Sequence, residues 1–309
     1  MLPRPERTVA PAAPAAPSPQ LCPVLPVRIV PCLDVRDGRV VKGVRFCDLA
    51  DQGDPAALAR AYEEQGADEV VVLDVTATPE ERGTRLDTVA SVRARLSVPL
   101  TVGGGIGGIE DAAALLEAGA DKVAVNTAAL RRPALLTGLA RRFGSQCVVV
   151  SIDALHRAGG GRTDGLDSAR AAQWLDGTPR RDEGDCGADY EVVVRSGTER
   201  VARDALSWAR EAVDRGAGEI LLTSIDRDGT RSGYELGLLR AVRSVVRVPI
   251  VASGGADSPD HMADAVGAGA DAVLAASIFH RGNWTVKGVK TALARLGVPV
   301  RPEYTARLR

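Results

Sequence analysis

The chain has 309 residues, of which 45% are hydrophobic, and its 39 basic and 40 acidic side chains leave a formal net charge of −1. This balance and the 3% aromatic content argue against nucleic acid or an anionic membrane as a partner, and no apolar run approaches the roughly 18 residues that a membrane span needs. The three histidines and five cysteines lack metal-ligand spacing, so we expect no metal. No two cysteines form a CxxC pair, so we expect reduced thiols in a cytoplasmic protein. We expect no other cofactor.

The first 26 residues differ in character from the rest of the chain. They contain eight of the 18 prolines, mixed with alanines. This composition cannot bury a core, and it lacks the apolar centre of a signal peptide. We therefore predict a disordered Pro/Ala-rich extension over residues 1–26 and a single folded domain over residues 27–309.

From Val27 onward, short apolar runs alternate with stretches that carry helix start and stop signals. Asp54 and Pro55 open one such helix, and Gly66 closes it. Strand and helix repeated in this way favour parallel pairing, and so an α/β fold of the (β/α)8 TIM barrel class. A doubly wound open sheet is the alternative, but no GxGxxG motif follows the first strand. The eight predicted strands lie at 27–33, 70–75, 99–102, 122–126, 147–152, 219–224, 249–253 and 272–277.

The sequence repeats itself at an offset of 150 residues. VPLTVGGGIGGIEDAAALLEAGADKVAVNTAAL, from Val98, aligns without gaps with VPIVASGGADSPDHMADAVGAGADAVLAASIFH, from Val248. GADEVVVLDVTAT, from Gly66, likewise aligns with GAGEILLTSIDRD, from Gly216. The repeat predicts one barrel built from two homologous half-barrels with pseudo-twofold symmetry.

Residues 155–189 break the pattern, because they are rich in glycine, charged and small residues. Loops longer than about 12–15 residues are uncommon in compact domains unless they are functional or disordered. We predict a flexible insertion over this range, followed by a short hairpin arm that begins at YEVVVRSG.

Two sets of glycine and hydroxyl residues follow strands at the expected C-terminal mouth, where active sites of such barrels lie. Glycine lets a backbone approach a ligand closely, and N–H groups at a helix start favour an anion. We interpret the sets as two phosphate sites; a tight strand-to-helix turn is the alternative for either set alone. The first set is Gly103–Gly105 with Asn126 and Thr127, and the second is Ser253–Gly255 and Ser277 with Asp228 and Gly229.

Asp34 and Asp153 end the first and fifth predicted strands, on opposite sides of this mouth. A carboxylate on each side of a bisphosphate substrate suits general acid–base catalysis, because one can donate a proton while the other accepts one. A cap or a buried ion pair is the structural alternative for either residue taken alone.

The chain resembles the cyclase subunit of imidazole glycerol phosphate synthase, the HisF family, over about residues 27–301 apart from the insertion. The segments that carry the resemblance are RIVPCLDVRDGRVVKGVRFCDLADQGDP, LTVGGGI, GADKVAVNTAA, FGSQCVVVSIDA, GAGEILLTSIDRDGT, SGGA and LAASIFH. It implies a lyase of histidine biosynthesis. Such an enzyme uses ammonia to convert a ribulosyl formimino bisphosphate into imidazole glycerol phosphate and aminoimidazole carboxamide ribotide.

The resemblance also implies roles for individual residues. Asp34 and Asp153 match the catalytic pair, with Asp153 acting in the attack and cleavage steps and Asp34 as the partner acid or base. The implied substrate and phosphate contacts are Lys42, Gly105, Asn126, Thr127, Ser224, Asp228, Gly229, Gly254, Gly255 and Ser277.

A glutamine amidotransferase partner is implied as well, in a heterodimer that supplies ammonia at the opposite face of the barrel. Four charged residues at the N-terminal strand ends match a gate around the ammonia entrance. A salt-bridge network that only stabilises the barrel is the alternative, because the bottom face generally serves stability. The four residues are Arg28, Glu69, Lys122 and Glu219.

Two other functions stay open at this point. The preceding isomerase of the same pathway resembles this fold, the repeat and the aspartate pair, although VVKGVRFCDL, FGSQCVVV and TSIDRDGT favour the cyclase. A non-catalytic phosphate-binding relative, its mouth obstructed by the insertion, is the second.

Overall fold

The computed structural model describes residues 25–44, 47–77, 80, 83–157, 190–194 and 199–301, with no side-chain description for 42–50. The predicted extension over residues 1–26 lies outside the described residues except for its last two. The predicted insertion over residues 155–189 also lies outside them except for its first three.

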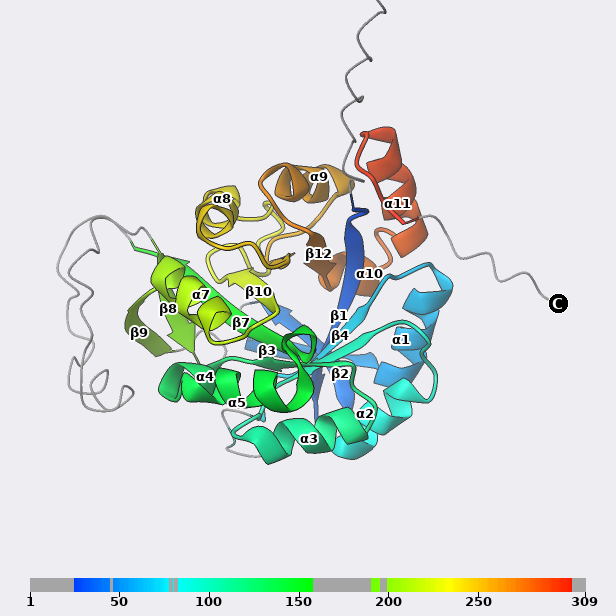
Figure 1. The fold of residues 1–309 in the computed structure, drawn as a ribbon. Coiled ribbons are helices and arrows are strands. Elements are labelled where there is room, and N and C mark those ends of the chain that lie inside the picture. The colour runs from blue at the N-terminus through cyan, green and yellow to red at the C-terminus, as the bar shows by residue number, and fades with distance from the viewer. Residues whose placement is uncertain are drawn as a thin grey trace, which may run out of the picture.

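A closed barrel of eight parallel strands forms the centre of the described part of the chain (Figure 1). The eight parallel strands run from β10 to β7 in the order of their pairing. Direct pairing of β7 with β10 closes this row into a barrel, which confirms the predicted (β/α)8 fold. In order around the barrel, the strands are β1 (Arg28–Arg36), β4 (Val70–Asp74), β5 (Leu100–Gly103), β6 (Lys122–Val125), β7 (Val148–His156), β10 (Glu219–Ser224), β11 (Ile250–Ser253) and β12 (Ala272–Ala275).

The helices surround the barrel and connect successive strands (Figure 1). The first helix starts at the predicted signal: the Asp54 side chain accepts a hydrogen bond from the backbone N–H of Ala57, ahead of Pro55 at the first helical position. They are α1 (Pro55–Glu64), α2 (Leu86–Arg93), α3 (Ile109–Glu117), α4 (Thr127–Arg131), α5 (Ala134–Phe143), the 3-10 turn η1 (Ser145–Cys147), α7 (Ala205–Asp214), α8 (Leu236–Val245), α9 (Pro259–Gly267), α10 (Ser277–His280) and α11 (Val286–Arg295). No helix in these ranges is long and apolar enough to cross a membrane.

Each half of the barrel extends its first strand with an antiparallel hairpin. In the first half, β2 (Arg39–Val44) pairs with β1 and with β3 (Cys47–Gly53). In the second half, β8 (Tyr190–Val194) pairs with β7 and with β9 (Glu199–Asp204), so the predicted hairpin arm is present. The matching hairpins reflect the same duplication as the sequence repeat.

Apolar side chains form two layers, one on each side of the strands. The larger layer packs the outer face of the strands against the helices. The smaller layer comes from alternate residues that point into the barrel, as the period of two along a strand requires. Its buried members are Val30, Cys32, Val71, Ala124, Val149, Leu221, Val251, Ala272 and Leu274.

Candidate active site

A cavity of about 860 Å³ lies at the C-terminal ends of the strands. Cys32 and Leu274 belong both to its lining and to the inner apolar layer, so that layer forms the floor. Thirteen of the residues predicted from the sequence line the cavity, although they are distributed over both halves of the chain. They are Asp34, Gly103, Gly104, Gly105, Asn126, Thr127, Asp153, Asp228, Gly229, Ser253, Gly254, Gly255 and Ser277.

Two other predicted residues stand apart from this lining. Lys42 lies on β2, and its side chain is outside the described part of the structure. Ser224 ends β10 and is buried, but it is not among the lining residues, whereas Thr223 is. Alternation along the strand explains the difference, because it points Thr223 inward and Ser224 to the opposite side. The Ser224 carbonyl instead accepts a hydrogen bond of 3.0 Å from the backbone N–H of Asp228 and so supports that loop.

Asp34 and Asp153 stand on opposite walls of the cavity. They lie on β1 and β7, which are four strand steps apart in either direction around the barrel. Both carboxylates are buried, with 5% and 8% of the residue surface exposed. The Cys32 thiol lies 3.5 Å from Asp34 Oδ1 and donates a weak hydrogen bond to it. The cavity therefore offers two buried carboxyl groups for proton transfer to one ligand.

Burial raises the pKa of Asp153 from its ordinary value of 3.8 to about 7. Hydrogen bonds from Asn126 and Thr223 oppose this rise by favouring the ionised form, and the nearby charge of Asp228 adds to it. Asn126 Nδ2 lies 2.9 Å from Asp153 Oδ2. A carboxyl group with a pKa near 7 can both accept and donate a proton at neutral pH, which suits a general acid–base catalyst.

This raised pKa predicts a pH-dependent stability. Between about pH 4 and 7 the folded protein keeps a proton on Asp153 that the unfolded chain has lost, so the free energy of unfolding should fall as pH rises from about 4 to about 7 and level off above that. The Asp153→Asn variant lacks this proton. Its stability advantage over wild type should grow by on the order of 2 kcal/mol from about pH 5 to about pH 8.5. Urea unfolding of both proteins measures this difference, and an advantage that stays flat or shrinks with pH would contradict it.

The glycines at the mouth have backbone conformations that other residues rarely adopt. Gly104 has φ +104°, and a Cβ there would lie 2.3 Å from the carbonyl oxygen of Asp74. Gly255 has φ +96°, and its Cβ would lie 2.2 Å from the carbonyl oxygen of Gly233. Both loops therefore require glycine to bring their backbone to the cavity wall.

Replacing Gly255 by alanine should distort the second glycine loop. We expect a cost of about 1–3 kcal/mol in stability and a raised KM for a phosphate-bearing substrate, because the added Cβ displaces backbone at the cavity wall. Steady-state kinetics and urea unfolding measure the two effects. Gly267→Ala is the matched control: Gly267 ends α9, and a Cβ there meets nothing within 4 Å. Equal behaviour of the two variants would argue against a special role for the loop.

Some lining residues were not singled out from the sequence. Thr223 could have been found by counting alternate positions along β10 from Glu219. Arg131 and Arg132, at the end of α4, bring positive charge to the side of the first glycine set. Arg231 lines the side of the second set; it has φ +62°, and its Nε lies 2.6 Å from Asp257 Oδ1. No sequence signal predicts that these arginines line the cavity, because they lie at the end of a short helix or in an irregular loop, where side-chain direction follows no regular period.

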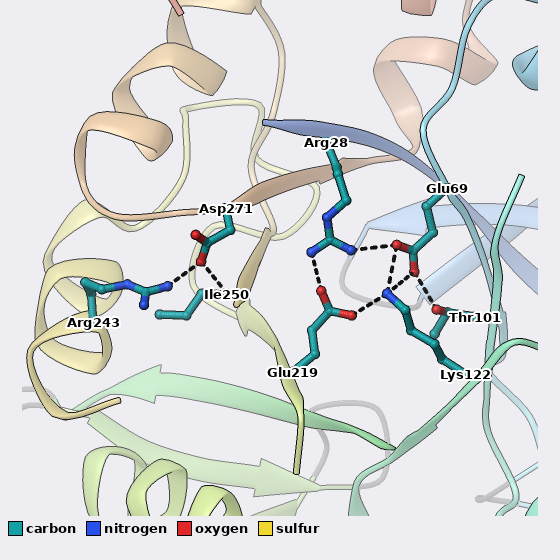
Figure 2. A network of polar contacts seen from close by, with 8 residues as sticks. All are labelled: Arg28, Glu69, Thr101, Lys122, Glu219, Arg243, Ile250 and Asp271. Atoms are coloured by element: carbon teal, nitrogen blue, oxygen red, sulfur yellow. Dashed lines mark hydrogen bonds and ion pairs between the residues drawn. The ribbon is translucent and has the colours of Figure 1, made fainter. Parts of the chain in front are cut away.

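At the N-terminal strand ends, the four predicted charged residues form a closed ring, which Figure 2 shows. Arg28 and Lys122 each bind both Glu69 and Glu219. Arg28 Nη1 lies 2.7 Å from Glu69 Oε2, and Lys122 Nζ lies 3.0 Å from Glu69 Oε2 and 2.7 Å from Glu219 Oε2. Thr101 adds a hydroxyl hydrogen bond of 2.5 Å to Glu69. The two carboxylates are 150 residues apart and so occupy equivalent positions in the sequence repeat.

The ring is held by charge as well as geometry. Burial alone disfavours the charged forms, but the opposite charges outweigh it. They raise the pKa of Arg28 and lower the pKa of Glu219. Outside the ring, Arg243 binds Asp271 (Figure 2), and the equivalent pair one repeat earlier is Arg93 with Asp121. The formal charges of the four ring residues, two basic and two acidic, sum to zero.

Comparisons with known proteins agree on one family. A model of the family described as histidine biosynthesis protein matches residues 28–285. The imidazole glycerol phosphate synthase subunit HisF of Salinispora arenicola is 51% identical over 277 residues, which cover 90% of this chain and 99% of that protein. The proteins of the same name from Mycobacterium tuberculosis and Methanosphaerula palustris are each 50% identical over 90% of this chain, with 96% and 99% of their own lengths covered.

Proposed function

The chain belongs to the histidine biosynthesis protein family and, within it, to the HisF subunits of imidazole glycerol phosphate synthase, and from this premise we propose that it carries out the cyclase reaction of that enzyme. The substrates would be ammonia and the ribulosyl formimino bisphosphate, and the products imidazole glycerol phosphate and aminoimidazole carboxamide ribotide. We place the reaction in the cytoplasm, in keeping with Cys32 and Cys147, which form no disulfide within the described residues.

The placement of Asp34 and Asp153 carries this proposal. The two carboxylates lie on opposite walls of one cavity, between two glycine and hydroxyl sets of opposite half-barrels. A ligand with a phosphate at each end would span the sets and bring its reacting centre between the carboxylates. The positions of Gly105, Thr127, Gly229, Gly254, Gly255 and Ser277 in the lining support phosphate contacts.

The chemistry follows from the two environments. Asp153, with its pKa near 7, would accept a proton from the attacking ammonia and return one in the later cleavage step. Asp34, on the opposite wall, would serve as the partner acid or base. Lys42, on the first hairpin, is proposed as a further substrate contact.

The relatives are named as subunits, and we propose that the missing subunit is a glutamine amidotransferase bound as a heterodimer at the N-terminal face. The ring of Arg28, Glu69, Lys122 and Glu219 would then be the gate through which ammonia enters. The inner layer between ring and cavity is apolar, a suitable path for an uncharged molecule. A ring that only stabilises the barrel is the competing view.

The decisive experiment compares ammonium salts at high pH with glutamine, each with and without a glutaminase subunit. The cyclase requires imidazole product from the bisphosphate with ammonium alone, and from glutamine only when the partner is present. Rearrangement of the aldose precursor without ammonia, together with no imidazole product, would identify the isomerase instead. Binding of the bisphosphate without any turnover would identify a non-catalytic relative.

A further inference from the structure

Asn126 joins the first phosphate set to the catalytic carboxylate. It follows β6 directly, and its carbonyl accepts hydrogen bonds of 2.9 and 3.2 Å from the backbone N–H groups of Ala129 and Leu130, so it begins α4. Its side chain reaches across to β7, where Nδ2 lies 2.9 Å from Asp153 Oδ2. One residue therefore belongs to both parts of the cavity.

The other end of the Asn126 amide differs from the end that binds Asp153. Oδ1 is buried and has no hydrogen-bond partner within the described part of the chain. The amide presents its NH2 end to Asp153, and this orientation suits the ionised carboxylate, the form that takes a proton from ammonia, because that form only accepts hydrogen bonds. A buried acceptor left in this way is unfavourable, and a ligand that supplies an N–H or O–H donor would remove the cost.

The second proposed phosphate set lacks this amide. The position equivalent to Asn126, 150 residues later, is Ala276, which precedes α10 and lines the same cavity. A methyl group there can neither hold a carboxylate nor accept a hydrogen bond. The Asn126 side chain therefore has a task that the second phosphate set does without.

We propose that Asn126 Oδ1 and the Asp153 carboxylate form an amine subsite that positions the attacking ammonia. Two neighbouring acceptors can hold two N–H groups of ammonia and leave its lone pair free to attack. The lone pair forms the new C–N bond to a carbonyl carbon of the bisphosphate, and the C=O electron pair moves to oxygen. That oxygen takes a proton from Asp34, and the nitrogen gives one to Asp153. This inference rests on the proposed cyclase function.

The test separates the KM for ammonium from the KM for the bisphosphate. Asn126→Ala is expected to raise the KM for ammonium about tenfold or more, through loss of an acceptor that contacts it, while the KM for the bisphosphate changes less than about threefold. Thr127→Val, in the same phosphate set, is the matched control and should raise the KM for the bisphosphate instead. If Asn126→Ala behaves like Thr127→Val, or changes neither KM, the amine subsite is wrong.

A variant of the same size guards against misfolding. Asn126→Asp replaces the donor to Asp153 with a second carboxylate, so the pH limb near 7 should move to higher pH. Asp228 also faces Asp153 and stays in place, as does the Thr223 hydroxyl. If the pH profile of Asn126→Asp superimposes on that of wild type, residue 126 does not affect the titration of Asp153, and the proposal is wrong. Wild-type protein without ammonium-driven turnover would instead contradict the cyclase function itself.

Discussion

Replacing Asp153 by asparagine should abolish turnover and leave the fold intact. The amide keeps the size and most contacts of the carboxyl group but cannot take a proton from ammonia. Loss of a positioned acid–base group typically costs about 10²–10⁴ in rate, and we expect the upper part of that range because Asp153 serves two steps. Ammonium-driven turnover measures the effect, and circular dichroism with thermal unfolding checks the fold.

Two further variants define the specificity of that result. Asp34→Asn should produce a loss of similar order, because the opposite wall supplies the other half of the proton transfer. Asp264→Asn, an exposed carboxylate on α9, should keep wild-type turnover. Near-wild-type turnover in folded Asp153→Asn would refute the catalytic role of Asp153.

Removing Lys122 from the charged ring should lower the free energy of unfolding more than any other substitution proposed above. In Lys122→Met, the Glu69 and Glu219 carboxylates would share Arg28 as their remaining basic partner in the ring. Their side chains are 4% and 6% exposed, so water cannot replace the lost partner. Breaking a buried ion pair on one side costs about 3–5 kcal/mol, and urea unfolding should show a decrease of this size.

The double variant Lys122→Met with Glu219→Gln tests the physical cause. It removes one charge of each sign, so it should recover a large part of the stability lost in the single variant. A single-variant cost below about 1 kcal/mol would show that the ring charges are effectively solvated.

The same variants also test the proposed gate. A ring that only stabilises the barrel predicts equal losses of turnover with ammonium and with glutamine plus the partner subunit. A gate predicts that the ratio of these two turnover rates changes.

The amino-acid sequence by itself determined the architecture, because its signals are periodic and duplicated. Eight apolar runs separated by helical stretches favour parallel pairing, and a repeat without gaps predicts two equivalent half-barrels. The same reasoning placed Asp34 and Asp153 on one face of the barrel, because the C-terminal ends of parallel barrel strands share a face. It also placed them on opposite sides of that face, because they end the first and fifth strands. The ring members could be placed at the other face for the same reason.

Only the tertiary structure decided which atoms meet. Thr223 rather than Ser224 lines the cavity because a shift of one residue along a strand reverses the direction of the side chain, and strand ends in sequence are uncertain by more than that. The bond from Asn126 to Asp153 joins residues 27 positions apart, and the Thr101 bond to Glu69 joins residues 32 apart. Such contacts depend on strand register and side-chain rotamers, which exist only once the barrel has closed.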